Sequence, residues 1–221
     1  PPDINTSYAE FHALNNTCIA YGMTAIKNMG SKAAQAVVEG RETSGAYNNI
    51  FDLCKINSHL INRKSIEALI QSGACDNLDG HRAQLFEIID GALRWGQKMC
   101  EDALSSQENL FNADTTETVI APPSLPNVDK WPTEECLRRE KEIIGFYLSG
   151  NPLEKYFDDI NEFANINLSE IPEKKPPNIR IGGIIQSVNS RYDKKNRPWA
   201  IVELSGTAGK ADIFVFNDVY E

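Results

Sequence analysis

The sequence predicts a mainly α-helical protein with a small β-hairpin near its start and a partial β-barrel at its end. Between residues 31 and 148, apolar side chains recur at helical spacing between turns that contain Gly, Asn or Pro. From Ile179 onward the hydrophobic pattern changes to a period of two, which indicates strands. The 221 residues are enough for one or two domains.

The composition is typical of a globular soluble protein, with 41% hydrophobic and 24% charged residues. No apolar run approaches the ~20 residues that a membrane span needs, and no signal peptide opens the chain. We therefore expect a cytoplasmic protein without a membrane partner. Because the chain begins Pro1-Pro2-Asp3 rather than with Met, we also expect it to be a piece of something longer.

The net charge of −9 argues against a uniformly basic nucleic-acid-binding protein, although it allows local basic patches. Between Glu101 and Ala121 there are several acids but no Lys or Arg, which is typical of a solvated segment. The five cysteines lack metal-ligand spacing and do not pair with the three histidines. We expect reduced thiols, no metal site and no cofactor.

The first element is expected to be a β-hairpin in which residues 8–14 and 17–21 flank Asn15-Asn16. Asn tolerates the left-handed conformation that a two-residue turn requires. A two-stranded hairpin is marginally stable alone, so it should pack on the helices that follow.

The stretch Ile26-Lys27-Asn28-Met29-Gly30 forms a tight turn between a short helix and a second helix. Gly30 is free to take a positive φ and has no Cβ, and Ser31 is a good N-cap. The exposed N–H groups at that helix start form an anion site, which Lys27 and Lys32 flank. The stretch resembles the helix-hairpin-helix motif, which binds nucleic-acid phosphates without reading bases. The alternative is an ordinary corner between two helices.

A second, degenerate unit of the same kind follows. Asn62 should cap a helix over residues 63–70, and a turn should lead into a long helix over residues 79–103. Two such units can straddle a duplex backbone, so we predict a tandem helix-hairpin-helix domain over residues 1–104. Cations lie at the exposed ends of the second unit, where the alternative is that they only solvate the surface: Arg63, Lys64, His81 and Arg82.

Residues 105–130 are predicted to be an acidic linker that carries a short docking peptide. Gln107, Leu110 and Phe111 have the form of a peptide that enters a preformed pocket, with Gln for polar orientation and Leu-Phe as the apolar anchor. The alternative is that Leu110 and Phe111 pack back on the helices.

A helical connector and linker should occupy residues 131–178. Thr133 is a plausible N-cap for a helix that runs through Leu148 and ends at Ser149-Gly150. Asn151-Pro152-Leu153-Glu154 then has the cap, the Pro and the Glu that restart a helix.

Residues 179–221 are predicted to be the N-terminal half of an OB-type barrel, with strands over residues 179–188, 199–204 and 210–216. Gly182-Gly183 should bend the first strand. Such barrels bind single-stranded nucleic acid on one face and on the first hairpin loop. Cations and an aromatic residue in that loop suit phosphate binding and base stacking, and the alternative is a solvated loop: Arg191, Tyr192, Lys194, Lys195 and Arg197.

The order of these parts resembles the C-terminal part of bacterial DNA polymerase III α subunits, and the resemblance runs over nearly the whole chain. Its most specific segments are residues 21–33, 62–85 and 140–153. The resemblance implies that the helical domain contacts duplex DNA, that an internal peptide binds the β sliding clamp, and that the OB domain contacts single-stranded template.

Carried onto this chain, the resemblance implies three sets of residues. Duplex binding falls on Lys27, Asn28, Gly30, Ser31 and Lys32, although the family often carries Gly where this chain has Asn28. Clamp binding falls on Gln107, Leu110 and Phe111. Single-strand binding falls on the loop from Arg191 to Arg197.

The resemblance also implies that the parent protein is a DNA-directed DNA polymerase, a nucleotidyltransferase of bacterial DNA replication. Its catalytic palm with Mg²⁺ would lie upstream of Pro1, and its contact with another replicase subunit would lie beyond Glu221. This piece is therefore expected to have no catalytic residue. Two alternatives remain: a helical protein-interaction module without DNA contact, and the corresponding region of another DNA repair enzyme such as a ligase.

Overall fold

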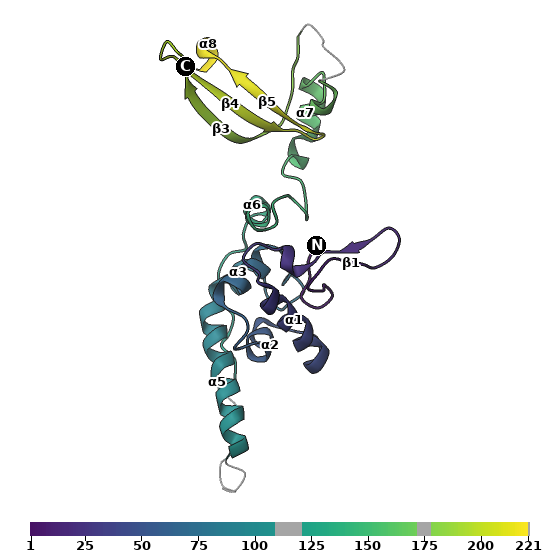
Figure 1. Ribbon diagram of the computed structural model, residues 1–221, viewed down its shortest axis with the longest axis vertical. Helices are drawn as coiled ribbons and strands as arrows, with labels where there is room; N and C mark the ends of the chain where they lie inside the picture. The colour runs from purple at the N-terminus through teal and green to yellow at the C-terminus, as the bar shows by residue number, and fades with distance from the viewer. Residues whose placement is uncertain (109–120, 172–177, 221) are drawn as a thin grey trace. The chain divides into compact units, whose positions relative to one another are not determined.

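A computed structural model describes residues 1–108, 121–171 and 178–220. These residues divide into two compact units, Pro1–Gly150 and Asn151–Glu221, which we describe separately (Figure 1). The first unit is mostly helical and includes a small β-hairpin, and the second contains a three-stranded antiparallel sheet, so the predicted fold class is confirmed. Within these ranges no helix has the length and apolar character to cross a membrane. The finer division into four parts stays a prediction.

The first unit begins with a β-hairpin that projects from a group of helices (Figure 1). Its elements in chain order are β1 (His12–Ala13), β2 (Ile19–Ala20), the 3₁₀ turn η1 (Met23–Ala25), α1 (Ser31–Ser44), α2 (Ile50–Ile56), α3 (Arg63–Gln71), α4 (Arg82–Glu87), α5 (Ile89–Glu108) and α6 (Thr133–Ile144).

Side chains from η1, the turn after it and helices α1 to α5 share one hydrophobic core. Burying these apolar surfaces together is the main force that holds the helices in place. Its fully buried side chains include Met23, Ile26, Val37, Ile50, Leu53, Ile66, Leu69, Leu85 and Ile89.

The β-hairpin is present but differs from the prediction in its turn. Neither Asn15 nor Asn16 has a positive φ. Instead, the side-chain Oδ1 of Asn15 accepts hydrogen bonds from the backbone N–H groups of Thr17 (2.9 Å) and Cys18 (2.8 Å). Only the base of the hairpin packs on the unit, since Ile19 in β2 remains 71% exposed.

The predicted long helix over residues 79–103 is wrong, because the chain forms two helices, α4 and α5, that meet at Ile88. Gly80 is in the left-handed region with φ 100°. The side chain of Gln84 then accepts a hydrogen bond from the N–H of His81 (3.2 Å), so the helix begins only at Arg82. The first turns of α5 are buried, and the helix packs against α2.

The predicted bounds of the α6 helix are also corrected. Pro132 is the N-cap and Thr133 is the first helical residue, so Thr133 does not cap the helix. The helix ends at Ile144 rather than at Leu148, because Gly145 adopts φ 97° and donates its N–H to the carbonyl of Lys141 (2.8 Å).

The second unit starts with a helical turn near the predicted restart, but this turn begins at Glu154 with Leu153 as its N-cap, so Asn151 is not the cap. Asn151 accepts the N–H of Leu153 (2.9 Å), and Glu154 accepts the N–H of Asn151 (3.3 Å). The elements that follow are η2 (Glu154–Tyr156), α7 (Phe157–Phe163), η3 (Leu168–Glu170), β3 (Ile184–Tyr192), β4 (Pro198–Ser205), β5 (Lys210–Val215) and α8 (Asn217–Tyr220).

The sheet has the order β3-β4-β5, with antiparallel neighbours. Its first strand begins at Ile184 rather than at Ile179, and the pairing shifts by one residue between Ile185 and Ser187. This irregularity, rather than the Gly-Gly pair, bends the strand. Gly183 lies so close to β4 that a Cβ there would sit 2.6 Å from the carbonyl oxygen of Ser205.

Candidate nucleic-acid interface

The turn between η1 and α1, together with the first two residues of α1, contains all five residues predicted to bind duplex DNA. Its backbone differs from the prediction, because Asn28 and not Gly30 takes the positive φ (70°). Gly30 is extended, with φ −73° and ψ 151°, and is itself the N-cap of α1. Ser31 is therefore the first helical residue rather than the cap. Asn tolerates the left-handed region better than most residues, which explains its presence at this position.

The start of α1 has no side-chain cap and is open to solvent. The first N–H groups of a helix have no partner within it, and Gly30 has no side chain to accept them. The first turn carries no acid, and a Cβ built on Gly30 would meet nothing within 4 Å. The helix dipole adds partial positive charge at this point. The backbone of Ser31 and Lys32 can therefore donate hydrogen bonds to a phosphate oxygen.

The charged side chains around this helix start are free to add to the site. Lys27 and Lys32 are both exposed, and neither forms an ion pair within the described part of the chain. Ile26 and Met29 are buried in the core and anchor the turn to it. The arrangement can bind a phosphate without contacting a base.

The predicted second helix-hairpin-helix unit, which contains α3 and α4 and which we call the second hairpin, has a helix start of the opposite kind. Asn62 caps α3 as predicted, since its Oδ1 accepts the N–H of Ser65 (3.0 Å). Arg63 is paired with Glu67 (2.7 Å) and Asp90. Lys64 is exposed and lies in the first turn of the helix, as predicted.

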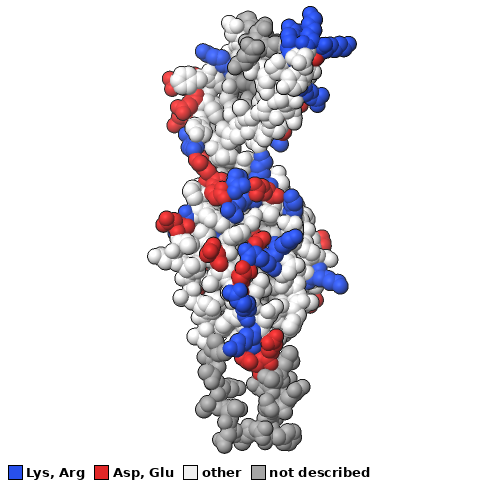
Figure 2. Space-filling model, turned by 90° about the vertical axis from the view of Figure 1, so that its left-hand side faces the viewer, with Lys and Arg blue, Asp and Glu red and all other residues white. Residues whose placement is uncertain are grey.

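At the start of α4, the basic side chain is likewise paired with an acid of the protein. The guanidinium of Arg82 is paired with the carboxylate of Asp76 at 2.6 Å, and the side chain of Arg82 is only 12% exposed. These helix starts are capped or neutralised by the protein itself. Accordingly, Figure 2 shows basic and acidic side chains alternating on one face, without one broad basic patch.

The end of β3 and the loop between β3 and β4 carry the residues predicted to bind a single strand. Asp193 organises the loop by accepting the N–H groups of Lys195 (2.7 Å) and Arg197 (2.9 Å) and the Nε of Arg197 (2.9 Å). Hydrogen bonds from Arg197 and Lys195 hold the pKa of Asp193 below its usual value, with the backbone bond from Arg197 contributing most. Arg197 is thus partly neutralised, while Lys194 and Lys195 are exposed.

One face of the sheet carries three aromatic rings that the sequence analysis did not bring together. Trp199 lies 6.2 Å from Phe214 and 5.7 Å from Phe216 between ring centroids, with interplanar angles of 18° and 25°. Phe214 and Phe216 are more than half exposed. The guanidinium of Arg191 lies 5.9 Å from the Trp199 ring. We call Trp199, Phe214 and Phe216 the aromatic face.

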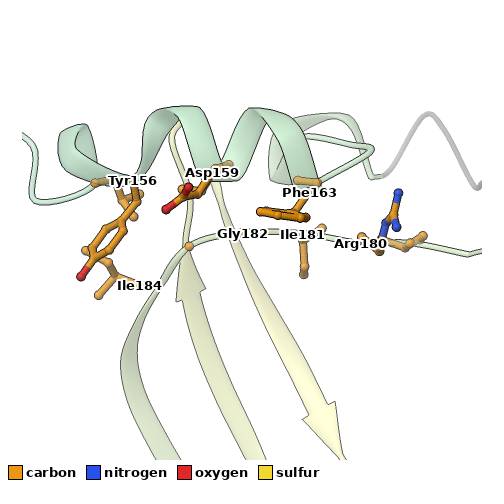
Figure 3. Close-up of a pocket in the computed structure, with 12 residues that line it drawn as sticks. Tyr156, Asp159, Phe163, Arg180, Ile181, Gly182 and Ile184 are labelled. Atoms are coloured by element: carbon orange, nitrogen blue, oxygen red, sulfur yellow. The ribbon is translucent and has the colours of Figure 1, made fainter.

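A cavity of about 700 Å³ lies elsewhere in the second unit, between α7 and residues 179–184. Figure 3 shows Phe163 on the helix side and Ile181 and Ile184 on the opposite segment. Apart from Asp159 and Arg180, its lining is largely apolar, and no predicted site residue lines it. This lining does not suit phosphate, so we leave the cavity out of the interface.

The predicted clamp peptide cannot be placed. Leu110 and Phe111 lie outside the described residues, and so does the side chain of Gln107. Clamp binding therefore stays a prediction. Among the described residues, no group of three or more His, Cys, Asp and Glu is arranged to hold a metal ion.

Comparison with known proteins gives two findings. Residues 1–85 match the helix-hairpin-helix motif family. The whole chain aligns with proteins named DNA polymerase III subunit alpha, at 29% identity in Escherichia coli (strain K12) and 32% in both Neisseria meningitidis and Borreliella burgdorferi. Each alignment covers 100% of this chain, and the chain spans only 19% of the relative's length.

Proposed function

We propose that this chain, which is homologous along its whole length to a region of DNA polymerase III α subunits, helps to hold a replicative DNA polymerase on its DNA. The observation that carries the proposal is the uncapped start of α1, flanked by two lysines that form no ion pair within the described residues. In this proposal the first unit binds the phosphate backbone of duplex DNA.

The chemistry of the site fits a duplex of any sequence. Backbone N–H groups and lysine side chains donate to phosphate oxygens, which every nucleotide presents, so the contact positions the DNA without selecting its sequence. A replicative polymerase needs this property because it copies every sequence it meets. In a chain of net charge −9, one such contact is modest and would act together with contacts made elsewhere in a longer protein.

For the second unit we propose that β3, β4 and β5 are the first half of an OB-type barrel that binds single-stranded template. Two features support this role. The aromatic face offers rings on which unpaired bases can stack, and stacking tolerates any base because every base has a π-face. Lys194 and Lys195 supply cations for the phosphates nearby along the strand.

Clamp binding and polymerisation complete the proposed role of the parent protein. We propose that Gln107, Leu110 and Phe111 bind the β sliding clamp. Nucleotidyl transfer with Mg²⁺ would belong to a part of the parent protein outside this chain. Replacing both Leu110 and Phe111 by Ala should abolish clamp binding measured by surface plasmon resonance, and unchanged affinity would remove the peptide from the proposal.

Salt-dependent binding of the full chain to primed DNA tests the DNA-binding proposal. The logarithm of the association constant should fall linearly with the logarithm of salt concentration, with a slope of about −0.9 for each duplex phosphate contacted. A flat response, or no binding at low salt, would overturn it. The acidity of the chain favours a second candidate in that case, a helical protein-interaction module without DNA contact.

A further inference from the structure

The DNA-contacting turn is held by a helix that lies more than one hundred residues later in the chain. The backbone N–H of Lys27 donates to the carbonyl of Ile143, in the last turn of α6, at 3.0 Å. Carbonyls at a helix C-terminus lack partners within the helix, so this bond satisfies one of them. On its other side, the carbonyl of Asn28 accepts a hydrogen bond from the hydroxyl of Ser65 (3.4 Å). The backbones of Lys27 and Asn28 are therefore both fixed by hydrogen bonds.

The end of α6 is in turn set by one buried carboxylate. Glu140 is 0% exposed and accepts three hydrogen bonds, from the N–H of Leu148 (2.5 Å), the N–H of Ser149 (2.8 Å) and the hydroxyl of Ser149 (2.6 Å). Hydrogen bonds to an ionised carboxylate are stronger than neutral ones. They fold residues 145–149 back against α6 after Gly145 has ended the helix.

The segment around α6 is also fastened to the second hairpin. The guanidinium of Arg139 lies 4.1 Å from the Trp131 ring and 5.2 Å from the Phe86 ring, and the two rings meet at 5.4 Å. The side chain of Gln84 donates to the carbonyl of Pro126 (3.0 Å). The buried Arg82 approaches Glu140 at 4.0 Å. The segment around α6 thus covers the second hairpin. Because α6 also bonds the turn at Lys27, it links the second hairpin to the first.

We propose that Glu140 is a positioning residue for duplex binding, acting through the α6 carbonyl of Ile143 on the backbone of the turn at Lys27. The DNA-binding element is then completed by α6 and the loop after it, beyond the residues 1–85 that match the motif family. In this proposal the second hairpin does not bind a phosphate. It packs against the segment around α6 and supports it. The inference rests on the proposed duplex binding by the first hairpin.

Two measurements on the full chain test this role with Glu140→Ala and Glu140→Gln. The first is hydrogen exchange at the Lys27 amide by NMR, and the second is affinity for a duplex of random sequence. Glu140→Ala should speed Lys27 exchange by about tenfold, the equivalent of one lost hydrogen bond, and weaken duplex binding several-fold. Glu140→Gln keeps an acceptor oxygen and should fall between Ala and the wild type.

The matched control is Arg138→Ala, which removes an exposed cation of the same helix that pairs with Glu135 (2.7 Å) and Glu142 (2.5 Å). It should leave both measurements unchanged. If Glu140→Ala does not fold, Ser149→Ala removes one of the three bonds and decides the question through Lys27 exchange. Wild-type exchange at Lys27 in a folded variant would overturn the inference. Absence of duplex binding by the wild type would overturn the proposed function instead, while Lys27 exchange still tests the positioning.

Discussion

The turn before α1 and the sheet of the second unit offer nucleic acid two different chemistries. The turn presents backbone N–H groups and two lysines, and residues 26–32 include no aromatic residue. The sheet presents three aromatic rings and a loop whose cations are partly paired. Phosphate contacts weaken steeply with salt, whereas stacking on rings does not. An acidic chain can thus bind DNA through local features, and each of the two chemistries can be removed separately.

The largest effect is expected from Gly30→Asp. The extended backbone of Gly30 is the conformation that an N-cap Asp adopts, and its Cβ would meet open space, so the fold should survive. The new carboxylate would accept the first N–H groups of α1 and repel phosphate. Duplex affinity should fall roughly tenfold to a hundredfold, as expected for losing charged hydrogen bonds.

Fluorescence anisotropy with a labelled duplex measures this loss, and thermal unfolding checks the fold. The control is Asn62→Asp, which adds the same charge at the start of α3 while keeping the cap. It should bind duplex DNA almost as the wild type does. Equal loss in both variants would mean that net charge, rather than the helix start, governs binding.

Trp199→Ala should come next, acting on single strands only. Removing one stacked ring costs about 1–3 kcal/mol of single-strand binding, and the slope of affinity against salt should stay the same. Phe214→Ala is a second variant with a more exposed ring. Tyr192→Ala is the comparison, because strand alternation points it away from the aromatic face. A loss with Tyr192→Ala but not with Trp199→Ala would place the contact on the loop instead.

Replacing both Lys194 and Lys195 by Ala should have a smaller effect on affinity and a clear effect on salt dependence. The slope for a single-stranded oligonucleotide should become shallower by roughly 0.7 for each phosphate that the variant no longer binds. Arg197→Ala should change the slope less, since Asp193 already pairs with that guanidinium. An unchanged slope in the double variant would exclude the loop cations from the interface with the single strand.

The smallest effect concerns pH and lies outside both contacts. Hydrogen bonds from Arg138, and then from Arg139, lower the pKa of Glu135 to about 2. Because the folded pKa is below the unfolded value, the stabilisation is present above about pH 4.3 and is lost as pH falls toward 2. At this partly exposed site it is worth no more than about 1 kcal/mol. Thermal unfolding of Glu135→Gln should show a weaker loss of stability below pH 4 than the wild type.

Local signals in the sequence predicted much of the fold. Asn62 caps its helix through its side chain, and the turn at residues 26–30 joins two helical elements as expected. The backbone details of that turn were not predictable, because either Asn28 or Gly30 could have taken the left-handed conformation. The end of α6 was missed for a different reason. Gly145 ends the helix in the left-handed conformation, and Glu140 then accepts the N–H groups of residues 148 and 149, neither of which a period count detects.

The aromatic face could be predicted only in part. Trp199, Phe214 and Phe216 all fall within predicted strands, but they come together only through the register of β4 with β5, in which Ile201 pairs with Phe214. Register depends on pairing between strands rather than on local sequence. For each site, the sequence therefore predicted which residue types take part. It did not predict which other residues hold them in place.

An NMR titration of the ¹⁵N-labelled chain with a short duplex tests the central claim most directly. If the start of α1 binds a phosphate, the amides of Ser31, Lys32 and Ala33 should show the largest shifts, and these shifts should reverse on adding salt. The capped start of α3 should shift little. Shifts concentrated on α3 or on the sheet, with the amides of Ser31 to Ala33 unmoved, would contradict the account.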